Sequence, residues 1–196
     1  MRRRHRGDSG QAFPIYITVV AGLLFLALAY LAVGQAGVNR SGAQTAADAA
    51  ALAAAQDKRD QLAGLWAEDL KDPAEWKDIF LGNSPVADSC WRAGELAEEN
   101  DARLDGCRPV SPLRFEAEVT TDKSVGDSVV PGTESVHSTA SAVAEIEPLC
   151  TFPGEDAKGD PLPELTCDGK IWKLDPDDRA GLPQPEDLFD VHLAER

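Results

Sequence analysis

The stretch FPIYITVVAGLLFLALAYLAV, Phe13–Val33, decides how this chain is organised, because its 21 residues carry no formal charge. At about 1.5 Å of rise per residue, a helix of this length spans a hydrocarbon layer roughly 30 Å thick. Tyr16 and Tyr30 lie near its two ends, where aromatic rings with a polar tip favour the headgroup region. Pro14 falls in the first turn, where a missing N–H costs least. We therefore predict a transmembrane helix over residues 13–37.

A cleaved signal peptide is the alternative interpretation of this stretch, because Ala27-Leu28-Ala29 resembles a signal-peptidase site. The apolar region is longer than the roughly 7–15 residues of a signal peptide, and apolar residues continue past the tripeptide. An uncleaved anchor is the favoured interpretation.

Charge predicts the orientation of the anchor. The segment before it contains four arginines against one aspartate, so the positive-inside rule places residues 1–12 in the cytoplasm. The remaining chain would then be extracytoplasmic, which makes this a single-pass protein of the cell membrane. The whole chain carries −15 at pH 7, residues 1–38 contribute +3, and residues 39–196 therefore carry −18. Such a surface repels nucleic acid, so no nucleic-acid partner is expected.

All four cysteines lie on the predicted outer side, where disulfides persist. They are Cys90, Cys107, Cys150 and Cys167, and three pairings are possible. We favour Cys90–Cys107 and Cys150–Cys167, because the members of each pair are 17 positions apart and enclose a polar, turn-rich segment. Closing a loop of that size is worth about 3 kcal/mol in the chain-entropy model.

The sequence over residues 38–70 predicts a second long helical segment, which is rich in alanine. The run from Ala43 to Gln56 is a strong helix former with little bulk, so another helix or a sheet can approach it closely. The residues expected to make this contact are Ala43, Ala46, Ala47, Ala50 and Ala54. Further along, Leu62, Leu65, Trp66 and Leu70 form one apolar stripe, which predicts that this half of the helix lies on a core.

Short helices and then strands follow. Asp72-Pro73 and Ser84-Pro85 each predict a helix start, the second helix ending near Asn100. Apolar and polar residues alternate over 113–120 and over 136–146, which predicts two strands. A two-stranded ribbon alone is marginal, so a third strand is expected from Ala102–Leu104 or from Lys170–Leu174.

These elements predict an α+β fold in which one helix spans the membrane and continues into a small extracytoplasmic domain of helix on antiparallel sheet. The expected divisions are a basic head at 1–12, the membrane helix at 13–37, the α+β domain at 38–147, and a Pro/Asp-rich, disulfide-closed extension at 148–196. The extension is expected to be irregular, with Ile171–Leu174 and Leu188–Leu193 as short ordered pieces docked on the domain.

Two segments resemble a known family. RGDSGQAFP, residues 6–14, precedes the membrane helix, and RSGAQTAADAAALAAA, residues 40–55, follows it. In this order they are similar to the TadE/TadG-like family of pilus-assembly proteins, the minor pilin-like components of the tight-adherence (Flp, type IVb) secretion machinery. The resemblance covers about 55 of the 196 residues. It implies a pilin-like head, other subunits of that machinery as partners and compatibility with a homo-oligomer.

The same resemblance implies a processing site. Pilin-like precursors are cut after a glycine at the membrane border, and a glutamate at the fifth position of the mature chain helps assembly. The matching glycine here is Gly10, followed by Gln11, whereas the fifth position is Ile15. Gly10–Gln11 is thus a candidate processing site, and the missing glutamate leaves entry into a filament and an anchored accessory role both open.

Motifs for chemistry are weak in this chain. Gly7-Asp-Ser-Gly10 imitates a serine-protease nucleophile segment but precedes the membrane helix. Asp175 to Glu186 has the length of a calcium loop, yet its sixth position is Ala180 rather than glycine. A zinc site lacks C-x-x-C spacing, and the outer histidines, His137 and His192, are far apart in the sequence. No catalytic residue, cofactor or metal is therefore predicted, and the four tryptophans are expected in the core.

The sequence thus favours a non-enzymatic, membrane-anchored pilus-assembly or minor pilin-like structural protein. One alternative is an anchored extracytoplasmic binding or sensor domain, which requires a concave apolar site lined by the outer aromatic residues. Another is an exported hydrolase, which requires clustered titratable residues.

Overall fold

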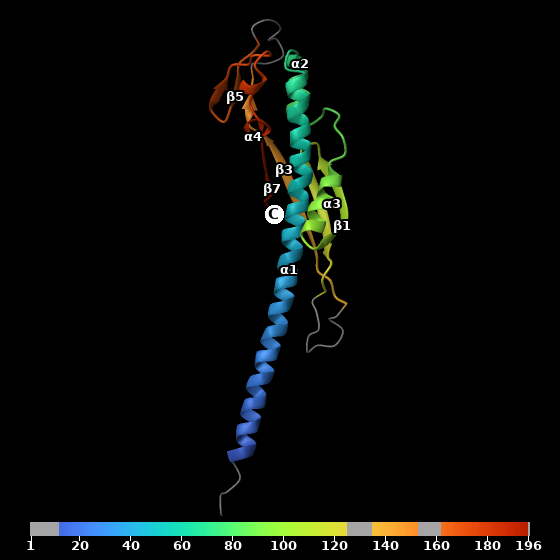
Figure 1. The fold of residues 1–196 in the computed structure, drawn as a ribbon, viewed down its shortest axis with the longest axis vertical. Helices are drawn as coiled ribbons and strands as arrows, with labels where there is room; N and C mark the ends of the chain where they lie inside the picture. Colours follow the sequence, from blue (N-terminus) through green and yellow to red (C-terminus); the bar gives the residue numbers. More distant parts are fainter. Residues whose placement is uncertain (1–11, 125–134, 153–161, 196) are drawn as a thin grey trace, which may run out of the picture.

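A single helix of 57 residues, α1 (Ala12–Glu68), organises the molecule. The computed structural model describes residues 12–124, 135–152 and 162–195. The helix is about 85 Å long at 1.5 Å per residue. Its first half stands clear of every other element, and its second half runs through a head formed by the rest of the chain (Figure 1). We use "head" for residues 39–195 as far as they are described.

The head is built on a four-stranded antiparallel sheet, which confirms the predicted α+β class. Its strand order is β1 (Ala102–Ser111), β2 (Arg114–Thr121), β3 (Thr139–Pro148) and β7 (Phe189–Leu193). Of the two candidates for a third strand, residues 102–104 supply it, as the start of β1. The second predicted strand begins at Thr139 instead of Val136.

Small residues let α1 lie close to the inner face of this sheet. Phe115 pairs with Ala144 and Ala117 pairs with Ala142 across β2 and β3, and all four are buried. The facing part of α1 is the alanine run. The small side chains of this run and of the sheet alanines allow α1 to lie against β2 and β3, with Phe115 as the bulky residue of the face.

Bulky aromatic residues replace alanine at the end of the head farthest from the free half of α1. There α2 (Pro73–Phe80) brings Trp76 against Trp66 of α1, with ring centroids 5.6 Å apart, and Phe80 against Phe189, at 5.2 Å. Phe152 completes the cluster at 5.7 Å from Trp76. Asp72 caps α2 by accepting a hydrogen bond from the Ala74 N–H, as its position before Pro73 predicts.

The helix predicted to open at Ser84-Pro85 begins later, so this prediction was wrong at its start. The structure has α3 (Cys90–Glu99), and residues 85–89 have no regular secondary structure. The reason is tertiary: the side chain of Gln61 on α1 accepts a hydrogen bond from the Ala87 N–H at 2.7 Å and donates one to Ser89 Oγ at 3.2 Å. These bonds hold the segment along α1, and the carboxylate of Asp88 accepts from the Cys90 N–H where the helix starts.

The C-terminal extension is more regular than predicted. It contains a second, three-stranded antiparallel sheet of β4 (Cys150–Thr151), β5 (Leu165–Cys167) and β6 (Lys170–Trp172), then η1 (Arg179–Gly181), α4 (Pro185–Leu188) and β7. Because β7 pairs with β3, residues beyond 148 complete the main sheet rather than only docking on it. Leu165, Leu188 and Phe189 of this extension are buried in the common core.

Candidate functional site

The free half of α1 is the most distinctive surface of the molecule. Residues Phe13–Leu31 form a helix segment long and apolar enough to cross a membrane, and no part of it is buried within the chain. Phe13 is 70% exposed and Tyr30 is 80% exposed. A core helix of a soluble protein would bury such side chains, so the exposure indicates a membrane anchor. The hydroxyl of Thr18 donates to the carbonyl oxygens of Pro14 and Ile15, so it needs no water partner.

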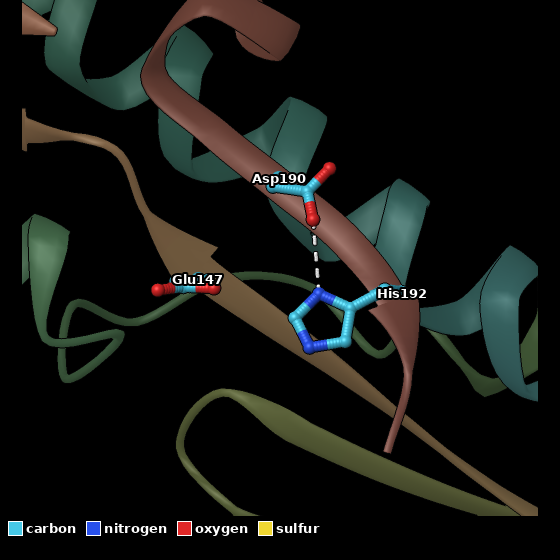
Figure 2. A group of neighbouring side chains, drawn as sticks. All are labelled: Glu147, Asp190 and His192. Carbon is cyan, nitrogen blue, oxygen red and sulfur yellow. Dashed lines mark hydrogen bonds and ion pairs between the residues drawn. The ribbon is translucent and has the colours of Figure 1, made fainter. Parts of the chain in front are cut away.

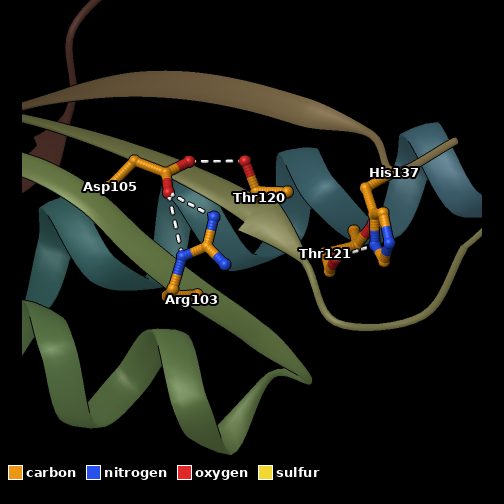
Figure 3. Close-up of polar contacts among 5 residues, drawn as sticks. All are labelled: Arg103, Asp105, Thr120, Thr121 and His137. Atoms are coloured by element: carbon orange, nitrogen blue, oxygen red, sulfur yellow. Dashed lines mark hydrogen bonds and ion pairs between the residues drawn. The ribbon is translucent and has the colours of Figure 1, made fainter. Parts of the chain in front are cut away.

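A polar cluster attaches the helix to the head just above this segment. Asn39 Nδ2 donates to the Lys123 carbonyl at 2.9 Å, and the Thr121 hydroxyl donates to Asn39 Oδ1 at 3.1 Å. His137 approaches the same place, with Nδ1 2.7 Å from the Thr121 carbonyl oxygen (Figure 3). Lys123 also pairs with Asp101 at 2.9 Å, and this pairing raises the pKa of its ammonium. His137 lies just before β3, which begins at Thr139, and contacts the same Thr121 that holds Asn39.

The outer face of the sheet carries paired charges. Arg103 and the Thr120 hydroxyl both bind the carboxylate of Asp105, and the Thr120 hydrogen bond is the main cause of the lowered pKa of that carboxyl (Figure 3). Arg114 binds Glu145 across β2 and β3 and lowers the pKa of Glu145. These pairs are exposed, so they shape a solvated face and contribute little to stability.

The four predicted disulfide residues form two bonds, Cys90–Cys107 and Cys150–Cys167, which is the pairing favoured from spacing. The first links α3 to β1, and the second joins Cα partners on β4 and β5. No cysteine is left free, so none is available as a nucleophile or a thiolate ligand.

The predicted helix-packing residues all lie inside the head. Ala43, Ala46, Ala47, Ala50 and Ala54 have no exposed surface. They face the sheet and α3 of their own chain, so they do not offer a surface to another subunit in this conformation. The candidate processing residues, Gly10 and Gln11, lie outside the described residues.

The four tryptophans differ in burial. Trp66 and Trp76 are fully buried, as expected, and Trp172 is half-buried beneath Lys170, whose Nζ is 3.3 Å from the ring centroid. Trp91 is 55% exposed, which corrects the expectation that all four belong to the core. It directly follows Cys90 at the start of α3, where the neighbouring disulfide already fixes the helix end.

Two grooves run along α1. One, of about 630 Å³, is mainly apolar and lies where the anchor meets the head, between Tyr30, Leu31 and Val38 on α1 and Thr121 and Lys123 on the head. The other, of about 1120 Å³, is more polar and lies between Arg40 and Gln44 of α1 and the start of β3. Neither is lined by a tryptophan, and Tyr30 of the anchor is the one aromatic residue, within the described ranges, that lines either of them, so neither is the pocket of outer aromatic residues that the binding-domain alternative requires.

One group of side chains that could hold a metal ion was not predicted from the sequence. Glu147 on β3 and Asp190 and His192 on β7 have ligand atoms within 4.8 Å of one another (Figure 2). His192 Nδ1 is 2.9 Å from Asp190 Oδ2. The only sequence signal was the alternation Asp190-x-His192, which places two side chains on one strand face. Glu147 lies 43 positions before Asp190 in the sequence, and only the pairing of β3 with β7 brings it near.

The Asp175–Glu186 segment, considered as a calcium loop, has other local roles. The Asp178 carboxylate accepts from the Gly181 N–H within η1, and Asp175 accepts from the Asp177 N–H. Just beyond the segment, Asp187 accepts from the Gln184 N–H at the start of α4. These aspartates satisfy backbone donors of turns and a helix end.

Comparison with known proteins agrees with the arrangement around α1. No curated protein and no solved structure matches the chain. The model of the Flp pilus-assembly TadE/G-like family matches residues 10–57. This region includes the membrane segment and the buried alanine run of α1. The match confirms the resemblance predicted from the sequence over this region.

Proposed function

We propose that this protein is a non-enzymatic, membrane-anchored structural subunit of a pilus-assembly machinery of the tight-adherence type. The observation that carries the proposal is the continuity of α1, whose first half is exposed and apolar and whose second half is the central core element of the head. Because one continuous helix contains both parts, the anchor fixes the position of the head relative to the membrane. The family match covers the same helix.

The proposed orientation puts residues 1–12 in the cytoplasm and the head outside the cell membrane. Support comes from the arginines before the anchor and from the two disulfides, which persist in oxidising compartments. The strong negative charge of the head fits an exported domain that stays soluble at the cell surface.

Contacts with other subunits would use the part of α1 that the head leaves uncovered. Val38 is 75% exposed, and Gly34 and Gly37 have open space beside them. Helices pack closely where small residues line the contact, so this segment suits another helix of the machinery or of a second copy. Processing at Gly10–Gln11 stays a prediction and would place the cut just before the anchor.

Orientation can be tested with introduced cysteines, because all native cysteines are in disulfides and an added thiol is the only reactive one. In intact spheroplasts, a membrane-impermeant maleimide should label Glu118→Cys, on the exposed outer face of β2, and should label the matched His5→Cys variant only after lysis. The reverse pattern would place the head in the cytosol and refute the proposed role.

Subunit contact can be tested by site-specific photocrosslinking in cells that express the whole secretion machinery. A crosslinker at Val38 should capture another subunit or a second copy, whereas one at Glu118, on the charged sheet face, should capture far less. A protein that remains monomeric, with no crosslink from Val38 and no partner after detergent extraction, would contradict the proposal.

A further inference from the structure

The corner of the sheet where β3 meets β7 gathers three side chains on its outer face. Glu147 and Asp190 are direct Cα partners, and His192 lies two positions beyond Asp190 on the same strand face. Ile146 and Phe189 point to the core and are buried, which confirms that their neighbours Glu147 and Asp190 point outward. The backbone pairing therefore fixes a histidine and two carboxylates together at one edge of the sheet (Figure 2).

Charge at this corner is unbalanced. Like charges placed directly opposite each other on paired strands are destabilising, and Glu147 and Asp190 form such a pair. The arginine nearest in register, Arg114, is already bound to Glu145. Among the described residues, His192 is the partner recorded for Asp190, and a bound cation would offset the negative charge that the two carboxylates place side by side.

Donor type and distance indicate which cation fits. We propose that Glu147, Asp190 and His192 form a binding site for a divalent transition-metal ion, of which Zn²⁺ is the representative. His192 Nδ1 and Asp190 Oδ2 lie 2.9 Å apart, so a small outward turn of either side chain brings them to the roughly 3.3–3.4 Å that separates two tetrahedral ligands of one Zn²⁺ at about 2.0–2.1 Å. The metal takes the place of the proton that the two atoms share, so the imidazole must bind in its neutral form.

Glu147 supplies the third ligand. Its carboxylate is already within 4.8 Å of the other two groups, and because the side chain is exposed, a change of torsion brings it into contact. An imidazole beside two carboxylates suits Zn²⁺ and its neighbours in the first transition row, whereas Ca²⁺ and Mg²⁺ prefer oxygen ligands alone. Three protein ligands leave one position for water at this open site.

Such an ion would link β7 to β3, because its ligands come from both strands. As the edge strand, β7 pairs with the sheet on one side only, so a metal bridge across the pair adds a constraint where the C-terminal part of the chain joins the main sheet. An ion that binds only the folded state raises the free energy of unfolding by RT ln(1 + c/Kd), where c is the free metal concentration, so the unfolding temperature rises with metal concentration.

The test is metal titration of the full-length protein in detergent micelles, purified without a histidine tag. Isothermal titration with ZnCl₂ should show one site per chain with a Kd on the order of 10 μM, as for an exposed three-ligand site. Co²⁺ should produce d–d absorption bands that report an imidazole-containing coordination shell. His192→Ala and Glu147→Gln should each weaken Zn²⁺ binding about tenfold or more and remove the cobalt bands.

The matched controls are His137→Ala, which removes the other described outer histidine, and Glu118→Gln, which removes a carboxylate elsewhere on the same sheet face. Both should bind Zn²⁺ as the unaltered chain does. Undiminished binding in His192→Ala or in Glu147→Gln, or an equal loss in His137→Ala, overturns the proposal. Should His192→Ala lose its native circular-dichroism spectrum, Glu147→Gln decides alone, because its side chain is exposed and nearly isosteric.

Discussion

The ammonium group of Lys58 donates a hydrogen bond of 3.1 Å to the carbonyl oxygen of Gly82 and ties the C-terminal part of α1 to the turn that ends α2. Lys58 is only 8% exposed, and burial lowers the pKa of its side chain below 10.5. The residue is thus a charged group held in the core by a backbone acceptor. It links the two helices that carry the aromatic end of the head.

Lys58 predicts a specific pH dependence of stability. Because the pKa is lower in the folded state, the unfolded chain binds the proton more strongly, and the protonated amine opposes folding at neutral pH. The free energy of unfolding should therefore rise as the pH increases through the folded pKa towards 10.5. Urea titrations at pH 7 and pH 9.5 should show this rise in the unaltered chain and a smaller rise in Lys58→Met. Identical pH dependence in the two proteins would show that Lys58 titrates as it does in water.

Two glycines should respond to alanine in opposite directions. Gly82 has φ +72°, and a Cβ there would lie 2.6 Å from Leu113 Cδ2, so Gly82→Ala should destabilise the head by about 1–3 kcal/mol. Gly64 lies in the exposed interior of α1 with open space beside it, so Gly64→Ala should stabilise by about 0.5–1 kcal/mol. Chemical denaturation of both variants measures the difference, and a shared sign would contradict the turn geometry.

Enlarging one alanine of α1 should disrupt the close contact between helix and sheet. Ala50 is fully buried, so Ala50→Leu should destabilise by about 1–3 kcal/mol through overpacking. Gln56→Leu adds a similar side chain on an exposed position of the same helix and should change stability by less than about 0.5 kcal/mol. Equal effects of the two changes would mean that the alanine run is not in the core.

Each disulfide should stabilise the head separately. Both pairs are separated by 17 positions, so replacing either pair by serine should cost about 3 kcal/mol. Loss of Cys150–Cys167 should first loosen the small sheet, and loss of Cys90–Cys107 should first loosen α3. Hydrogen exchange of the two variants would locate these changes, while uniform loosening in both would argue against independent roles.

A charge within the anchor should impair membrane insertion. Leu24 lies in the middle of the apolar segment, where arginine costs about 2.5–3.5 kcal/mol for insertion. Leu24→Arg should therefore move protein from the membrane fraction to the soluble or degraded fraction, while Val38→Arg, beyond the segment, should not. Fractionation with an alkaline carbonate wash measures this. Full retention of Leu24→Arg would contradict a single membrane-spanning helix at this position.

The sequence by itself determined the features that depend on composition and on short-range periodicity. The uncharged run at Phe13–Val33, the alanine-rich helix and the alternating strand over 113–120 each carry their signal in adjacent residues, because helix and strand place side chains at periods of 3.6 and 2. The equal spacing of the cysteines was enough to favour the pairing that the structure contains.

Tertiary structure alone decided where those elements meet. Contacts from Gln61 keep residues 85–89 out of a helix although Ser84-Pro85 resembles a helix start, since hydrogen bonds between distant residues outweigh a weak local preference. Pairing of β7 with β3 draws the extension into the main sheet and sets Glu147 beside Asp190 and His192. The register of this pairing is set by burial of apolar residues across the whole core. No local run of residues therefore specifies which strand pairs with which sheet edge.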